Sequence, residues 1–246
     1  MLKAAVLTRQ GLGRTVNQDR VVVNQTVVDP QPAKTSVFSA ELPSLVAVLD
    51  GLGGHPAGDV AASLAAEVIA SASSEVRSEP DVVALVEEAN RFLYQTMATF
   101  PILQYMGTTI AGVLVTLEAV TVFHVGDSRV YFHAGGDLVQ ATVDDRRDGY
   151  VTQTLGGHDS FEPIRVHAST EPRADRRILA ATDGLFDHTD RETLSPAMNG
   201  LLEEVPDQLS QVAIESANPD DFSVAVIEPS TAAQAGDPAP GTEGLS

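Results

Sequence analysis

Four aspartates of this 246-residue chain border strongly apolar segments, three of them shortly after such a segment and one shortly before. These four are Asp50, Asp127, Asp183 and Asp220. At the end of a strand, a side chain can reach a rim of the sheet shared with distant stretches of sequence, and a glycine after Asp50 and after Asp183 lets the backbone turn sharply. Any one of these aspartates alone is also explained as a turn residue, because Asp-Gly is a favoured turn pair.

Taken together, the four carboxylates predict a metal site. Carboxylates gathered at one rim repel one another and raise each other's pKa unless a cation neutralises them. Because the chain has no cysteine, the ligands are all oxygen, which favours Mg²⁺ or Mn²⁺ over zinc or copper. Two such ions about 3.5–4 Å apart deprotonate a bridging water that attacks phosphorus. The pattern therefore predicts phosphate-ester hydrolysis without a covalent intermediate, and the lack of cysteine excludes a thiol nucleophile.

Composition restricts the partners that this chain can have. Its length suits a single domain. A formal charge of −19, with only 15 basic residues, opposes a nucleic-acid or anionic-membrane partner. The apolar runs are shorter than the roughly 20 residues of a membrane span, and no charged segment near Met1 leads into an apolar stretch as in a signal peptide. We therefore expect a cytoplasmic protein with no nucleic-acid or membrane partner.

Hydrophobic periodicity predicts the elements that must position the aspartates. The predicted strands are residues 2–8, 20–24, 44–49, 109–116, 119–125, 129–133, 138–142, 163–168, 177–181 and 222–227. The predicted helices are one from Asp59, its expected N-cap, and others over residues 81–99, 192–202 and 206–217. Residues 29–43 read as a loop, and residues 229–246, rich in Pro, Gly, Ala and Ser, as a disordered tail. Because strands follow one another without helices between them, the fold class is α+β with packed sheets.

Six short motifs, and the order in which they follow one another along the chain, resemble those of the metal-dependent protein phosphatases of the protein phosphatase 2C type. They are RTVNQD (14–19), DGLGGHPAG (50–58), GTT (107–109), VGDSRVY (125–131), ATDGLFD (181–187) and DDFSVAVI (220–227). The resemblance covers residues 2–228 and implies a four-layer α-β-β-α sandwich, two antiparallel sheets flanked by helices. It makes residues 1–228 a catalytic domain and 229–246 a tail.

The resemblance also implies a role for each site residue. Asp50 would bridge two core Mg²⁺ or Mn²⁺ ions, the Gly51 carbonyl would bind one of them, and Asp183 and Asp220 the other. Asp127, with Asp183, matches a pair that binds a weaker third ion in bacterial members. Asp19 matches an acid that acts near the second ion through water. Arg14 matches the arginine that binds the substrate phosphate, a role that its planar fork suits.

The chain departs from the family pattern at several positions. Gln18 stands where many members have Glu, and Asp220–Asp221 replaces the usual Asp-Asn, so that Asp221 is an alternative ligand. Only residues 144–154 fill the place of the bacterial flap, which predicts a shortened or absent flap. We expect this stretch to be a solvated loop, although Arg146 and Arg147 could meet an acidic phosphopeptide.

Three histidines have simple structural explanations. We expect His55 to stabilise a turn rather than to act as a proton donor. His124, inside a strand, is expected to be packed or hydrogen-bonded, and His158 to lie on an exposed loop.

The function implied is hydrolysis of phosphoserine or phosphothreonine on proteins that are targets of a Ser/Thr kinase. Two alternatives remain open. One is a pseudophosphatase that binds phosphoproteins as a regulator, and the other is a hydrolase of small phosphate esters. The intact acids oppose the first, because a binding module has no need of mutually repelling carboxylates.

Overall fold

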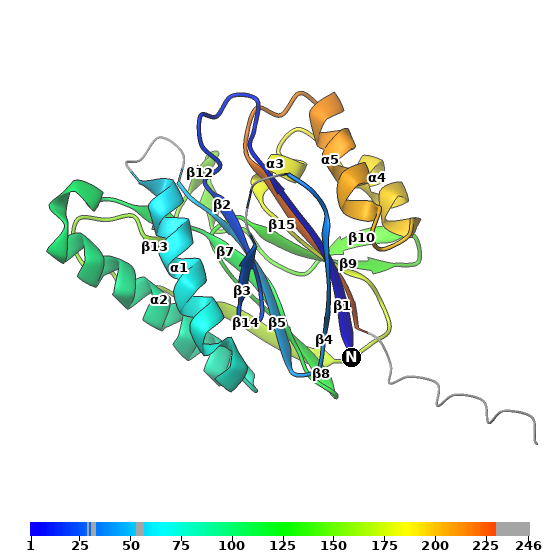
Figure 1. The fold of residues 1–246 in the computed structure, drawn as a ribbon, viewed down its shortest axis with the longest axis horizontal. Coiled ribbons are helices and arrows are strands. Elements are labelled where there is room, and N and C mark those ends of the chain that lie inside the picture. The colour runs from blue at the N-terminus through cyan, green and yellow to red at the C-terminus, as the bar shows by residue number, and fades with distance from the viewer. Residues whose placement is uncertain (29, 31–32, 53–56, 230–246) are drawn as a thin grey trace, which may run out of the picture.

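The computed structural model describes residues 1–28, 30, 33–52 and 57–229. Two antiparallel sheets pack face to face, and helices cover the outer face of each, so the predicted four-layer sandwich is confirmed (Figure 1). The His55 prediction and the predicted tail beyond Pro229 fall on residues outside those described.

The first sheet joins the two ends of the described chain. In spatial order its strands are β10 (Asp137–Gln140), β9 (Arg129–Ala134), β15 (Ile178–Ala181), β16 (Phe222–Pro229), β1 (Leu2–Arg9) and β4 (Ser36–Ala40). The central pair β1 and β16 is in register over eight residues, from Leu2 opposite Pro229 to Arg9 opposite Phe222. The outer face of this first sheet is covered by α3 (Asp183–Phe186), α4 (Arg191–Leu194), η3 (Ser195–Asn199) and α5 (Val205–Glu215).

The second sheet packs against the first through its inner face. Its strands are β14 (His167–Pro172), β8 (Ala119–Val125), β7 (Ile110–Val115), β5 (Ser44–Asp50), β2 (Asp19–Val23) and β3 (Thr26–Val28). Its outer face is covered by α1 (Gly58–Ala72) and α2 (Glu79–Thr99), which are followed by the short turns η1 (Ser73–Glu75) and η2 (Pro101–Leu103). Two-residue ladders pair β6 (Gly107–Thr108) with β13 (Leu155–Gly156), and β11 (Arg146–Arg147) with β12 (Tyr150–Val151).

The apolar runs of the central strands are continuous because both faces of each sheet are buried. Along β5, Leu45 and Leu49 join the core under α1 and α2, whereas Val46 and Val48 join the core between the sheets. Alternate side chains of one strand thus serve two cores. None of the described helices combines the length and apolar character needed to cross a membrane.

Several predicted boundaries are wrong, and the errors lie at edge strands and helix starts. The stretch read as a loop contains β4, an edge strand whose side chains are at most half-buried and therefore give little hydrophobic signal. The strand predicted at residues 163–168 lies instead at His167–Pro172, also at an edge, because Ile164 and Val166 pack on the core from an irregular segment. The helix α1 begins at Gly58, so Asp59 lies in its first turn and is not its N-cap.

The strands predicted over residues 109–142 do not form one continuous antiparallel series. The pair β7 and β8 belongs to the second sheet, and the pair β9 and β10 belongs to the first. The chain therefore crosses between the sheets within residues 126–128, which places Asp127 at the junction.

Candidate active site

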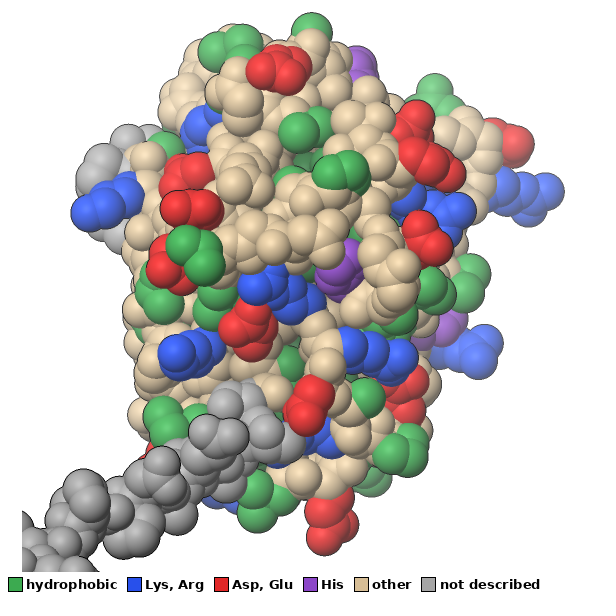
Figure 2. Space-filling model, turned by 90° about the vertical axis from the view of Figure 1, so that its right-hand side faces the viewer, with side chains coloured by type: hydrophobic (Ala, Val, Ile, Leu, Met, Phe, Trp, Pro, Cys, Tyr) green, Lys and Arg blue, Asp and Glu red, His purple; other side chains and the backbone are tan. Residues whose placement is uncertain are grey.

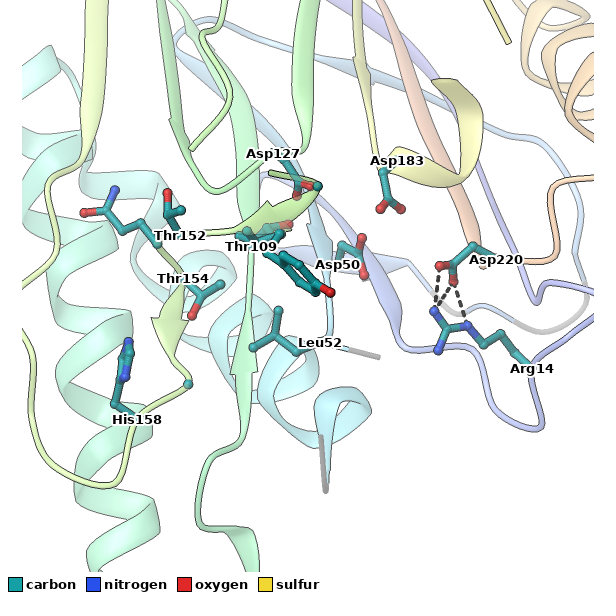
Figure 3. Close-up of a pocket in the computed structure, with 15 residues that line it drawn as sticks. Arg14, Asp50, Leu52, Thr109, Asp127, Thr152, Thr154, His158, Asp183 and Asp220 are labelled. Carbon is teal, nitrogen blue, oxygen red and sulfur yellow. Dashed lines mark hydrogen bonds and ion pairs between the residues drawn. The ribbon is translucent and has the colours of Figure 1, made fainter. Parts of the chain in front are cut away.

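One pocket of about 420 Å³ lies at the end of the sandwich where both sheets contribute acidic residues (Figure 3). The second sheet supplies Asp50, the last residue of β5, and Asp127, two residues after β8. The first sheet supplies Asp183, two residues after β15, and Asp220, two residues before β16. All four aspartates line this pocket, together with Arg14. The rim predicted for one sheet is thus formed by the ends of two.

Burial and mutual repulsion disfavour the charged forms of these acids. Burial raises the pKa of Asp183 to about 7, and the neighbouring carboxylates, Asp127 first, add to the effect. The pKa of Asp127 is raised to about 6, again mainly by burial, although Arg146 lowers it. Asp50 has a pKa well above the ordinary range, through burial and then Asp183. The chain alone therefore does not supply enough positive charge to offset these carboxylates.

Unpaired oxygen atoms mark the position for that missing charge. Asp19 Oδ1, Asp127 Oδ2 and Asp183 Oδ1 are buried and have no hydrogen-bond partner among the described residues, although Arg146 Nε lies 3.4 Å from Asp127 Oδ2. Buried carboxylate oxygens normally accept hydrogen bonds or bind a cation. A cluster made only of oxygen donors fits Mg²⁺ or Mn²⁺. The residues present are therefore suited to hold hard divalent ions.

The GTT motif fixes the backbone of Asp50. The Asp50 carbonyl accepts hydrogen bonds from Thr108 Oγ1 and from the Thr109 backbone N–H, both at 2.8 Å. Thr109 Oγ1 is also 2.7 Å from Ser128 Oγ, in the motif that contains Asp127. These bonds hold two of the acidic segments in a fixed relation to each other.

Gly51 is required by close packing of the backbone. A Cβ at this position would collide with the Gly58 carbonyl at the start of α1 and would lie 2.8 Å from Gln18 O. The sequence reasoning attributed this glycine to a carbonyl that must approach a metal. The structure adds a different reason, namely that β5 and α1 meet here without room for a side chain.

Asp220 and Asp221 point to different places. Asp220 lines the pocket, whereas the Asp221 carboxylate is buried and accepts backbone N–H groups from Gly11 at 2.9 Å and Gln18 at 2.8 Å. Gly184, after Asp183, packs on the Asp221 carbonyl so closely that a Cβ would overlap it. Asp221 therefore ties together the loops around the site, and Asp220 is the member of the pair that faces the pocket.

Arg14 faces the pocket and is held by Asp220. Its Nε donates to Asp220 Oδ1 at 2.7 Å and its Nη2 to Asp220 Oδ2 at 2.6 Å (Figure 3). The remaining terminal nitrogen, Nη1, has only a long contact to Gln18 Oε1 at 3.5 Å. The predicted phosphate-binding arginine is thus oriented by a predicted metal ligand, with one nitrogen weakly engaged.

Asp19, the ladder partner of the pocket residue Asp50, lies in a buried polar network. It is paired with Asp50 in the β2–β5 ladder and is 1% exposed. Its Oδ2 accepts the Thr182 hydroxyl at 2.8 Å, and Thr182 Oγ1 in turn accepts the Ser223 backbone N–H at 3.0 Å. The network continues from Ser223 Oγ to Thr8 Oγ1 at 2.8 Å. The sequence analysis missed these hydroxyl residues, although Thr182 directly precedes Asp183 and Ser223 is two residues after Asp221.

The shortened flap is a small hairpin that reaches the acids. The sequence analysis expected a solvated loop here, but β11 and β12 form a two-residue ladder, and Arg146 contacts Asp127 and Asp187. Arg147 does extend into solvent, with 85% of its side chain exposed. No sequence signal distinguishes these adjacent arginines, because only the strand pairing decides which one faces the site.

His124 and His158 agree with their predicted roles. His124 is buried in β8, with Nε2 2.8 Å from Val143 O and its ring stacked on that of His167. His158 has a half-exposed side chain at the pocket edge and lies 3.7 Å from Glu162.

The fold and site define a class of protein, namely α-β-β-α sandwiches with a carboxylate-lined site for hard divalent ions between the sheet ends. The chain belongs to the protein phosphatase 2C family, whose model matches residues 31–216. It is 28% identical to the serine/threonine protein phosphatase PstP of Mycobacterium tuberculosis, over 93% of this chain and 45% of that protein. It is 32% identical to the serine/threonine phosphatase stp of Listeria welshimeri, over 41% of this chain and 42% of that protein.

Solved structures agree with this assignment. The catalytic domain of PstP in complex with two manganese ions matches with a TM-score of 0.75 and 26% identity, over 93% of this chain and 99% of that one. Stp1 from Staphylococcus aureus, at 21% identity, shares the fold with a TM-score of 0.80, over 94% of this chain and 96% of that one. The chain spans about half the length of the curated relatives it matches.

Proposed function

We propose that residues 1–229 are the catalytic domain of a metal-dependent phosphatase that hydrolyses phosphoserine and phosphothreonine on proteins. The observation that carries this proposal is the group of four aspartates that line one pocket, two of which, Asp127 and Asp183, have a buried oxygen without a hydrogen bond among the described residues. Membership of the protein phosphatase 2C family and the likeness to the manganese complex of PstP support it. The stretch 230–246 would be a tail outside this domain, one residue shorter than predicted, because Pro229 is the last residue of β16 and pairs with Leu2.

The residues of this chain divide into metal ligands and substrate ligands. Asp50 would bridge two Mg²⁺ or Mn²⁺ ions, with the Gly51 carbonyl on one and Asp183 and Asp220 on the other. When bound, the ions supply Lewis-acid activation of water and stabilise the charge that develops on the phosphate. Asp19, opposite Asp50 in the β2–β5 ladder, would act near the second ion through water.

Arg14 would bind and orient the phosphate. Its contacts to Asp220 fix the plane of the guanidinium, and Nη1 remains for a phosphate oxygen. A planar fork held in advance loses little side-chain entropy when the substrate binds. Asp220 thus has two roles in this proposal, as a metal ligand and as the residue that positions Arg14.

The proposed partners are phosphorylated proteins, in keeping with the names of the relatives. Figure 2 shows one face of the molecule, on which Lys and Arg side chains lie among Asp and Glu side chains. The described residues of that face thus form no uniformly basic surface of the kind that binds nucleic acid. A kinase that supplies the substrates and a cytoplasmic location remain predictions.

Hydrolysis assays test the proposal directly. We expect turnover of para-nitrophenyl phosphate with Mn²⁺, loss of turnover in EDTA, and faster hydrolysis of phosphothreonine peptides than of small phosphate metabolites at equal concentration. No turnover at any Mn²⁺ or Mg²⁺ concentration, with phosphopeptide binding retained, would instead indicate a pseudophosphatase. A preference for small metabolites would indicate an ester hydrolase of another kind.

A further inference from the structure

A tight hairpin holds Arg146 in a defined place beside the acidic site. Strands β11 and β12 are joined by Asp148 and Gly149, both with positive φ (53° and 85°), the conformation that two-residue hairpins favour. Asp145, just before the hairpin, exchanges two hydrogen bonds with Gly126, one from its backbone N–H to Gly126 O and one from Gly126 N–H to Asp145 Oδ2, both at 2.9 Å. The hairpin is therefore attached to the residue that precedes Asp127.

The guanidinium of Arg146 lies between the carboxylates of Asp127 and Asp187. Its Nε is 3.4 Å from Asp127 Oδ2, which belongs to the loop after β8. Its two terminal nitrogens donate to Asp187 Oδ1 at 2.7 Å and to Asp187 Oδ2 at 2.9 Å, just after α3. The bidentate pair with Asp187 holds the guanidinium in place, because moving it would break both hydrogen bonds to the Asp187 carboxylate.

Asp127 depends on this cation for its charge balance. Its side chain is 1% exposed, and Oδ2 is the atom without a hydrogen bond. Burial raises its pKa, and Arg146 is the strongest influence that lowers it. The positive charge that faces Asp127 Oδ2 in this chain is thus part of the protein.

We propose that Arg146 is a built-in cation that takes the place of a third divalent ion at Asp127 and Asp183, so that this enzyme works with two ions. The inference rests on the proposed two-ion site. A third ion held by Asp127 and Asp183 would bring a second positive charge close to the guanidinium, whose Nε lies 3.4 Å from Asp127 Oδ2. Shortening of the flap and loss of the third ion would then be one change, because the short hairpin carries the replacing charge.

Counting bound Mn²⁺ tests this proposal without relying on activity. Electron paramagnetic resonance of free Mn²⁺ and isothermal titration calorimetry would be applied to wild type, Arg146→Gln and Arg147→Gln. The second variant is a matched control, since it removes the same charge from the same hairpin at an exposed position. We expect two bound ions on wild type and on Arg147→Gln, and three on Arg146→Gln. The third ion on Arg146→Gln should bind more weakly than the two core ions, but at least about tenfold more tightly than any third ion on wild type.

Each outcome has a distinct meaning. The third ion should be absent from the double variant that combines Arg146→Gln with Asp127→Asn. Arg146→Lys retains the positive charge and should therefore bind only two ions. The proposal is overturned if wild type binds a third Mn²⁺ as tightly as Arg146→Gln does, or if that variant, with an unchanged circular dichroism spectrum, gains none. Absence of Mn²⁺ binding to wild type would instead refute the two-ion site itself.

Discussion

Replacing Asp183 by asparagine should stabilise the metal-free protein and inactivate the metal-loaded one. The pKa of Asp183 is raised from 3.8 to about 7 in the folded chain. A shift of about 3 units corresponds to about 4 kcal/mol of unfavourable interaction when the group is ionised. Asn has a similar shape and no charge, but its buried amide needs partners. We therefore expect a net gain of about 2–4 kcal/mol in the free energy of unfolding at pH 8 in EDTA.

The pH dependence follows from the same shift. Below about pH 4 the carboxyl is protonated in both the folded and unfolded states, so Asp183 contributes nothing to the difference. Between about pH 4 and pH 7 the folded state binds more protons than the unfolded state, so wild-type stability falls as pH rises. The advantage of Asp183→Asn should therefore grow over this range and level off above about pH 7.

Manganese should reverse the order of stability. At 1,000 times its dissociation constant, a bound ion adds about 4.1 kcal/mol to wild type, which exceeds the expected gain of about 2–4 kcal/mol in the variant, and the variant lacks a ligand for that ion. Turnover of para-nitrophenyl phosphate should fall at least about 100-fold in the variant. Urea unfolding from pH 4 to 8, with EDTA or Mn²⁺, measures the first effect, and steady-state kinetics measure the second.

A control separates this effect from loss of net charge. Asp175 is exposed, so Asp175→Asn removes the same charge without relieving the cluster and should leave stability within about 0.5 kcal/mol of wild type. The reasoning is refuted if Asp183→Asn destabilises the metal-free protein at pH 8, or if its effect does not change with pH.

Three other substitutions test the surroundings of the site. Arg14→Ala should raise KM about tenfold or more. The affinity for Mn²⁺, measured by calorimetry, should not fall, because removal of the guanidinium frees the Asp220 carboxylate. Weaker Mn²⁺ binding would show that the role of Arg14 is misassigned. Arg129→Met should cost about 2–3 kcal/mol in urea unfolding, because it leaves Asp144 without the arginine that donates to both of its carboxylate oxygens. A neutral result would contradict this. Thr182→Val should cost about 2–3 kcal/mol in the same assay, because Asp19 Oδ2 loses its hydroxyl donor; equal stability would mean that water replaces it.

The sequence predicted the central strands and the acidic positions well, because both depend on local patterns. Buried strands such as β5 and β8 are continuous apolar runs, and the aspartates stand at their ends. Edge strands were misplaced for the opposite reason. Half-exposed strands such as β4 and β14 carry a weak hydrophobic pattern, and their position is set by the neighbour to which they bind.

By itself, the sequence determined which residues are acidic, that each stands at the end of a buried segment, and that oxygen ligands with no cysteine suit hard divalent ions. Only the tertiary structure decided which of them meet. Arg14 reaches Asp220 across 206 residues of sequence, and Arg146, not Arg147, faces Asp127. Such contacts come from the packing of two sheets and the register of one short hairpin, and neither leaves a local pattern in the chain.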